Sequence, residues 1–260
     1  GVPSARRTMH AVHPVPARRS ARRARCALAA AATLLATTAL VRPAAAEVPA
    51  ALARQCEREL APARMDVRVD TVPVQYDFTR SLAELGRAGP PGRPGYVTTG
   101  LTVRQLQTQA RWADSAFALP DGTGCLRPSI TVTLAFVRHT VYVAREFPPG
   151  SCAHRDTLEH ERIHVQLNER QAAEAARRLR ERLRAAFGQR VFYGRLAALR
   201  AQLDEALQSD WLPWLEARLA SGAAEHAAFD RHQLDEAVRA CPKEKQQLLR
   251  AAQLAGTPLR

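Results

Sequence analysis

The chain has 260 residues, of which 46% are hydrophobic and 24% charged, and a formal net charge of +13. This length and balance suit a globular protein with a substantial core, and they exclude a disordered, collagen-like or multi-span membrane protein. The positive charge is concentrated in residues 1–46, which contain eight arginines and no acidic residue. The remaining 214 residues hold 30 basic and 25 acidic side chains, so we expect no nucleic-acid partner.

Residues 1–46 have the organisation of a secretory signal peptide. Residues 18–25 are rich in arginine, residues 27–41 form an apolar run, and small residues precede Glu47. As a helix this run would rise about 22 Å, which is less than the roughly 30 Å of a hydrocarbon core. We therefore predict an exported protein, periplasmic or secreted, without stable membrane insertion after signal cleavage. An uncleaved membrane anchor is the alternative.

Export changes the interpretation of the cysteines. Cleavage would remove Cys26 and leave four disulfide candidates, which are Cys56, Cys125, Cys152 and Cys241. An even number of cysteines in an oxidising compartment favours two disulfides, with three possible pairings. A four-thiolate zinc site is the alternative, but the chain has no C-x-x-C pair and the gaps are unlike those of zinc knuckles.

Residues 47–260 are predicted to form a single α+β domain, because a strand-rich part is followed by a helical part without βαβ alternation. Residues 47–150 form the strand-rich part, for which we expect a mostly antiparallel sheet. Alternation of apolar and polar residues predicts its strands, a turn at 121–124 and a Gly/Pro-rich loop. The predicted strands lie near 67–72, 106–112, 130–136 and 141–143, the loop covers 86–95, and a tight turn is expected at Arg138-His139.

Residues 151–260 form the predicted helical part. Ser151 is a suitable N-cap, residues 152–187 contain no proline or glycine, and Gly188 is a natural stop, so one long helix is expected. Two further helices are predicted at about 194–210 and 222–240. The segments that separate them are Trp211-Leu212-Pro213-Trp214 and Ser221-Gly222.

The long predicted helix contains an H-E-x-x-H motif at His160, Glu161 and His164. Positions i and i+4 of a helix lie about 40° apart, so both imidazoles can bind one Zn²⁺ ion at about 2.0–2.1 Å. Glu161 lies about 100° round the helix from His160, where it can reach a water on the metal and act as the general base. A charged, solvent-exposed helix face is the alternative interpretation.

A catalytic zinc site needs a third protein ligand. Leu167 and Arg170 stand where a metzincin has glycine and histidine, so the ligand must come from elsewhere. In the last predicted helix, Asp230 lies near the centre of the apolar stripe, and a core-facing carboxylate needs a cation or a metal. We predict Asp230 as the third ligand, with His226 as the alternative and Glu225 after it. An arginine partner for Asp230 competes with this role. The stripe consists of Ala223, Ala227, Leu234 and Val238.

A strand-rich half followed by a helix with this motif resembles the zincin-type metallopeptidases. More narrowly, residues 66–170 are similar to the bacterial secreted zinc-dependent protease family described as DUF922-like. The similarity rests on Leu85-Gly86 to Pro91, on the 96–112 segment, and on the order Cys125, 130–136, His160. The resemblance implies a zincin-like domain, a periplasmic or secreted location, one zinc ion and protease activity. It carries over only His160, Glu161 and His164.

We therefore expect an exported zinc-dependent metallopeptidase, a hydrolase that cleaves a peptide or protein substrate with a zinc-activated water. By analogy with zincins in general, the substrate strand would lie along the sheet edge near residues 141–146. The alternatives are an exported non-catalytic zinc-binding protein and a metal-free helical interaction protein of the cell envelope.

Overall fold

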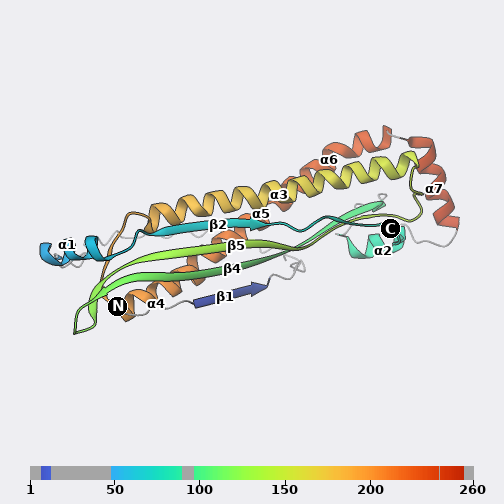
Figure 1. Cartoon of the computed structure of the whole chain (residues 1–260). Helices are drawn as coiled ribbons and strands as arrows, with labels where there is room; N and C mark the ends of the chain where they lie inside the picture. The colour runs from blue at the N-terminus through green and yellow to red at the C-terminus, as the bar shows by residue number, and fades with distance from the viewer. Residues whose placement is uncertain (1–6, 13–47, 90–96, 240, 255–260) are drawn as a thin grey trace, which may run out of the picture.

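The computed structural model describes residues 7–12, 48–89, 97–239 and 241–254 (Figure 1). The apolar run and Cys26 of the predicted signal peptide lie outside these residues. Within the first 46 residues the structure describes strand β1 (Arg7–Val12), which pairs antiparallel with strand β4 (Gly100–Ala118). Among the described residues, none of the helices combines the length and apolar character needed to cross a bilayer.

The sheet is built around a long antiparallel hairpin formed by β4 and β5 (Thr123–Val143). The predicted turn connects the two strands. Gly122 has a φ of 78°, which a residue without Cβ adopts at little cost. The Asp121 carboxylate accepts hydrogen bonds from the backbone amide and the hydroxyl of Thr123, at 2.9 and 2.6 Å. Such a local side-chain bond stabilises the turn.

The sheet is mixed, so the expectation of a mostly antiparallel sheet holds only in part. Strands β2 (Arg64–Asp70) and β3 (Gln75–Asp77) both run parallel to β5, whereas β6 (Phe192–Arg195) pairs with β5 antiparallel. The strand order is β1-β4-β5-β2. After β2 and β3 the chain returns along β4 and reverses again into β5. These two reversals make β5 run in the same direction as β2. The alternation of apolar and polar residues within a strand does not indicate the direction of its neighbours.

The tight turn expected at Arg138-His139 does not form, because β5 continues through these residues to Val143. Instead, the register shifts there: Gln105 pairs with Arg138, but Leu106 pairs with Phe136. Val137 is left without a cross-strand partner and is 42% exposed. An extra residue of this kind is a β-bulge, which bends the strand and breaks its alternation. The interruption of the apolar alternation near residues 137–139 therefore marks a β-bulge rather than a turn.

Two short helices flank the strands. Helix α1 (Ala50–Glu59), which we did not predict, is joined to β5 by the disulfide Cys56–Cys125. Helix α2 (Leu82–Ala88) extends into the segment that we predicted as a loop from residue 86. Ser81 and Glu84 form a capping box, in which each side chain accepts a hydrogen bond from the other's backbone amide. This capping stabilises the first turn of α2 despite the glycines that follow.

The long helix α3 (Cys152–Phe187) has the bounds that the sequence predicted. The Ser151 hydroxyl accepts a hydrogen bond from the His154 amide at 3.1 Å, as expected of an N-cap. Figure 1 shows α3 lying along the sheet. Its second half packs with β2, β4, β5 and the next helices in the main core, which includes Val67, Trp112, Ile130, Val132, Leu134, Ala175, Leu179, Leu183, Leu203 and Leu215.

The chain continues in a helical path through the segment predicted to separate two helices. Helix α4 (Leu196–Ala206), the π-helical turn η1 (Leu207–Trp211) and helix α5 (Leu212–Ser221) follow one another directly. Pro213 lies in the first turn of α5, where a missing backbone N–H is tolerated. Helices α6 (Ala223–Arg239) and α7 (Pro242–Leu254) follow.

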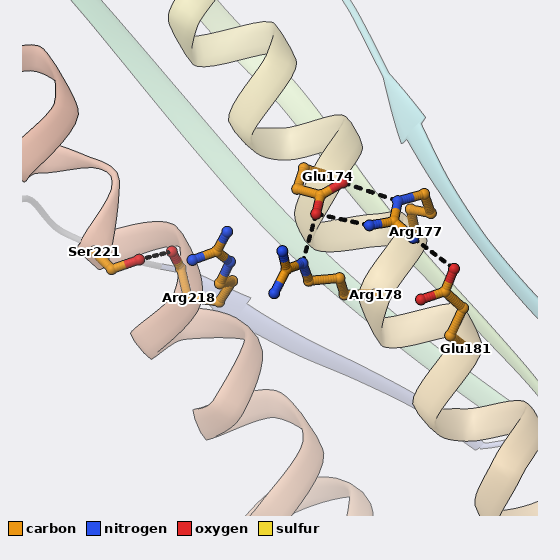
Figure 2. Close-up of polar contacts among 6 residues, drawn as sticks. All are labelled: Glu174, Arg177, Arg178, Glu181, Arg218 and Ser221. Atoms are coloured by element: carbon orange, nitrogen blue, oxygen red, sulfur yellow. Dashed lines mark hydrogen bonds and ion pairs between the residues drawn. The ribbon is translucent and has the colours of Figure 1, made fainter.

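The outer side of α3 carries a network of ion pairs (Figure 2). The Glu174 carboxylate accepts two hydrogen bonds from Arg177, both at 2.8 Å, and a further one from Arg178. Arg177 also donates to Glu181 at 2.6 Å. Across from this network, the Ser221 hydroxyl donates to the Arg218 carbonyl at 2.7 Å near the end of α5. Exposed pairs at i+3 and i+4 support a helix without defining a site.

Candidate metal centre

Helix α6 runs antiparallel beside the first half of α3 (Figure 1). At one end, the Gln171 side-chain amide donates to the Gly222 carbonyl at 3.1 Å. At the other end, the disulfide Cys152–Cys241 joins the start of α3 to the residue beyond α6, with 5.9 Å between the Cα atoms. These two attachments fix the register of α6 against the face of α3 that carries the H-E-x-x-H motif.

The structure brings together His160, His164 and Asp230, the three residues predicted as metal ligands. The Nε2 atoms of His160 and His164 are 3.1 Å apart. Oδ1 of Asp230 lies 2.8 Å from Nε2 of His164 and 3.3 Å from Nε2 of His160. One turn of α3 therefore supplies two ligand atoms, and α6 supplies the third.

The spacing of these atoms fits a tetrahedral zinc ion. Ligands bound at about 2.0–2.1 Å in a tetrahedron lie about 3.3 Å from one another. The three observed separations of 2.8, 3.1 and 3.3 Å are close to that value. Two imidazoles and one carboxylate are also a donor set that zinc takes in catalytic sites. The Asp230 side chain is 51% exposed, so the side of the cluster formed by α6 faces solvent.

Glu161 lies beside this cluster and is only 5% exposed. Its Oε2 accepts a hydrogen bond from the Thr102 hydroxyl of β4 at 2.6 Å. Burial raises the pKa of Glu161, and the Thr102 hydrogen bond and the two histidines partly offset that rise. The carboxylate is thus held between β4 and α3, next to the three candidate ligands.

Gly100 of β4 allows this close approach of strand and helix. A Cβ at this position would lie 2.6 Å from Oε1 of Glu161 and 2.7 Å from Cγ2 of Thr157. Both distances are shorter than any ordinary contact, so the backbone of β4 can approach α3 only where the side chain is absent. Sequence reasoning missed both Gly100 and Thr102, since neither belongs to a recognisable motif and their roles depend on the packing of β4.

His226, the alternative ligand, lies on the other side of His164. Its Nδ1 is 2.7 Å from Nδ1 of His164, and the two rings are stacked. It therefore contacts the nitrogen of His164 that faces away from Asp230. Burial, with help from His164 and Arg104, lowers the pKa of His226 to about 4. Glu225, the next candidate, is bound by Arg170 and by Gln171 and does not join the cluster.

Asp230 reaches the cluster for a different reason from the one predicted. The prediction relied on a buried apolar stripe, but Ala223 and Ala227 are exposed, and the side chains of Leu234 and Val238 lie outside the described set. The carboxylate contacts His160 and His164 instead of an arginine partner. Burial acts to raise the pKa of Asp230, but the hydrogen bonds to the two histidines outweigh it and the pKa is lowered.

Two other expectations about the site are corrected. The end of β5 is not a sheet edge, because Thr140, Val141 and Tyr142 are paired with β3 on one side and β4 on the other. A substrate strand therefore cannot pair with β5 there. His139 is 1% exposed instead of lying in a turn, and its Nε2 is 3.3 Å from Nδ2 of Asn168.

The four described cysteines form two disulfides, Cys56–Cys125 and Cys152–Cys241, as the count predicted, and the structure decides between the three pairings. Glu244 lies near the second disulfide, but both sulfur atoms are already bonded to each other and are not available as thiolate ligands. Instead, Glu244 accepts a hydrogen bond from the Ala153 amide at 3.1 Å. These four cysteines thus join helices and strands and leave no free thiolate among the described residues.

Comparison of the chain with protein families, with curated proteins and with solved structures found no match. The functional argument therefore depends on the geometry of the described residues.

Proposed function

We propose that this protein is an exported zinc-dependent metallopeptidase with a zincin-like arrangement of helix and sheet. The observation that carries the proposal is the convergence of His160, His164 and Asp230 beside the buried carboxylate of Glu161. His160 and His164 would hold the ion from α3, and Asp230 would hold it from α6. The resemblance of the motif and its setting to zincins points to the same chemistry.

When bound, zinc would supply Lewis-acid activation of water and of the scissile carbonyl. Glu161 is the group that would take the proton of the attacking water and deliver it to the leaving amine. The Thr102 hydroxyl donates a hydrogen bond to one oxygen of Glu161 at 2.6 Å and would hold the carboxylate in place for this transfer. Burial of Glu161 excludes bulk water from the carboxylate. It also raises the pKa, so this carboxylate takes up a proton more readily than that of an exposed glutamate.

The export part of the proposal is supported by the two disulfides, since such bonds persist in oxidising compartments. The proposal includes neither stable membrane insertion nor a nucleic-acid partner. The substrate would be a peptide or protein.

A non-catalytic zinc site is the second candidate. The low exposure of Glu161 and His164, 5% and 9%, favours it, because a substrate must reach both the ion and the base. In that case the ion would join α6 to α3 and stabilise the fold. A metal-free helical interaction protein, the third alternative, does not explain why two imidazoles and a carboxylate converge.

The test is the substitution Glu161→Gln, with zinc content and hydrolysis of unfolded protein or peptide mixtures measured on the same preparations. The exposed neighbour Glu159→Gln is the matched control. For a peptidase, both variants retain about one zinc per chain, and only Glu161→Gln loses activity, by roughly 10²–10⁴-fold.

Each other outcome selects a different alternative. Bound zinc without hydrolysis by the parent protein would favour the structural site. Hydrolysis that survives Glu161→Gln would remove the proposed base. If neither the parent nor a His160→Ala variant contains zinc after purification without chelators, the result would favour the metal-free alternative.

A further inference from the structure

The two disulfides differ in their surroundings. Cys56 and Cys125 are both 0% exposed and lie together in a buried apolar cluster. Cys152, by contrast, is exposed, and Cys241 is half-buried. Disulfide exchange requires a thiolate to reach one of the two sulfur atoms, so exposed disulfides are the labile ones of a protein. The bond between Cys152 and Cys241 is therefore the one that a reductant in solution reaches more easily.

The backbone at Cys241 is also strained. Its φ is 54°, and no other residue apart from glycine has a positive φ in the part of the chain that the structure describes. A residue with a Cβ avoids this left-handed region, which glycine ordinarily occupies after a helix. Such a conformation persists only where the surrounding structure imposes it. The bond to Cys152 is a covalent restraint at this position, so reduction would allow the backbone to relax, which favours the reduced state.

Helix α6 has few apolar contacts of its own with the rest of the protein. Its described side chains, residues 223–232, belong to none of the buried apolar clusters. Phe229 is the one large apolar side chain among them, and its ring centroid lies 4.8 Å from that of His160 and 5.1 Å from that of His164. A helix with so little buried apolar surface separates locally at low cost. The position of α6 therefore depends strongly on the attachments at its two ends.

The end of α6 at Cys241 has a second attachment through α7. Glu244 accepts a hydrogen bond from the Ala153 amide at 3.1 Å, and Lys245 forms an ion pair with Asp156. These contacts would keep α7 beside the start of α3 when the disulfide is reduced. Reduction would thus loosen α6 without unfolding the protein.

We propose that the Cys152–Cys241 bond is a reversible redox site and that its reduction weakens zinc binding at the metal centre. Asp230 reaches His160 and His164 from α6, so a loosened α6 withdraws the third ligand atom from the other two. This inference rests on the zinc site of the proposed function and deepens it by naming how that site is regulated. It does not depend on peptide hydrolysis.

The partner in this exchange is a dithiol. One of its thiolates attacks a sulfur atom of the bond and forms a mixed disulfide, and its second thiol then displaces the remaining cysteine. The dithiol becomes a disulfide and gives up two electrons and two protons, which leave Cys152 and Cys241 as thiols. The oxidised form of the same partner reverses the exchange and restores the position of α6.

Zinc binding and reduction must then oppose each other equally. If reduction weakens zinc binding by some factor, saturating zinc lowers the equilibrium constant for reduction by the same factor, because the two equilibria are linked. We expect a factor of about 10, since α7 retains part of the attachment and changes outside the ligand shell typically cost about 10- to 100-fold in metal affinity. A disulfide that only lies near the metal centre would show no such factor.

The test equilibrates protein from an exporting host in buffers of reduced and oxidised glutathione, with saturating zinc and after chelation. Two glutathione molecules then take the place of the dithiol, with the same electron balance. Alkylation of free thiols and peptide mass spectrometry measure the reduced fraction of each disulfide. The Cys56–Cys125 bond is the internal control and should stay oxidised. In Asp230→Ala, zinc should no longer alter the reduction of the other bond.

Zinc affinity provides the second half of the cycle. It is measured on the oxidised and the reduced protein by competition with a zinc indicator, after glutathione has been removed without air. The reduced protein should bind zinc about tenfold more weakly, and reoxidation should restore the affinity. Circular dichroism verifies that the reduced protein is folded.

The proposal is overturned if both disulfides resist reduction equally, or if zinc leaves the reduction of Cys152–Cys241 unchanged. An increase in zinc affinity on reduction would overturn it too, because the freed thiolates and Glu244 would then bind an ion themselves. The zinc content of the oxidised protein keeps this result separate from the proposed function. A zinc-loaded protein without coupling would remove the redox site alone, whereas an oxidised protein that takes up no zinc would contradict both.

Discussion

Asp230 of α6 and His164 of α3 meet with 2.8 Å between Oδ1 and Nε2, although three helical segments and a strand separate them in the chain. The contact is possible because α6 runs antiparallel along α3 and is joined to its start by the Cys152–Cys241 disulfide. The carboxylate completes a set of ligand atoms that the H-E-x-x-H motif alone leaves incomplete. The consequences of this arrangement can be tested one residue at a time.

Replacing Asp230 by alanine should weaken zinc binding by more than the 10- to 100-fold that is typical of changes outside the ligand shell. The parent should lose thermal stability when a chelator removes the ion, because a metal that binds only the folded state stabilises it. Asp230→Ala should show a much smaller response to chelation. Competition with a zinc indicator and thermal unfolding measure the two effects. Glu225→Ala is the control, and equal affinities of both variants would contradict the assignment.

Gly100→Ala should disturb the site more than the fold. The new methyl group would lie 2.6 Å from Oε1 of Glu161, so either the carboxylate or β4 must move. We expect hydrolysis to fall at least about tenfold while zinc content stays near that of the parent, since a small displacement of a catalytic group is costly. Gly86→Ala in α2 is the matched control, because nothing lies within 4 Å of its added Cβ. An unchanged rate in Gly100→Ala would show that Glu161 is not held as described.

Removing the second disulfide should affect metal binding as well as stability. The double variant Cys152→Ser, Cys241→Ser frees the end of α6 from α3, and loss of such a bond costs roughly 2–5 kcal/mol of unfolding free energy. Because the same bond fixes the register of Asp230, zinc affinity should fall too. The variant Cys56→Ser, Cys125→Ser lacks the disulfide of α1 and is the control. If both double variants bind zinc as the parent does, the disulfide has no part in positioning Asp230.

The Glu174 network predicts a pH dependence of stability. Hydrogen bonds from Arg177 and Arg178 lower the pKa of Glu174 to about 2 from its ordinary value of 4.5. The folded state therefore binds fewer protons, so the contribution is present above about pH 4.5 and is lost as the pH falls towards 2. The Glu174 side chain is 31% exposed and its ion pairs lie at the surface, so the contribution is small. The free energies of unfolding of the parent and Glu174→Gln, measured in urea, should differ at pH 6, and the difference should shrink as the pH falls towards 2.5. A difference that grows on acidification would contradict the sign.

Local patterns in the sequence were sufficient for the elements whose stability is itself local. The absence of proline and glycine after Ser151 predicted α3 within its observed bounds, and the glycines near Asp121 predicted the turn between β4 and β5. The same periodicity put His160 and His164 on one face. These features depend on interactions between residues a few positions apart, which a sequence displays directly.

Features that depend on distant residues were decided by the tertiary structure. The parallel direction of β2, the bulge at Val137, the disulfide pairing, and the roles of Gly100 and Thr102 all require segments far apart in the chain to meet. Asp230 was predicted as the third ligand, and its neighbour His226 remained the alternative. The packing of α6 on α3 decides between the two residues, because it places Asp230 at Nε2 of His164 and His226 at Nδ1. The relative position of these two helices cannot be deduced from a local sequence pattern.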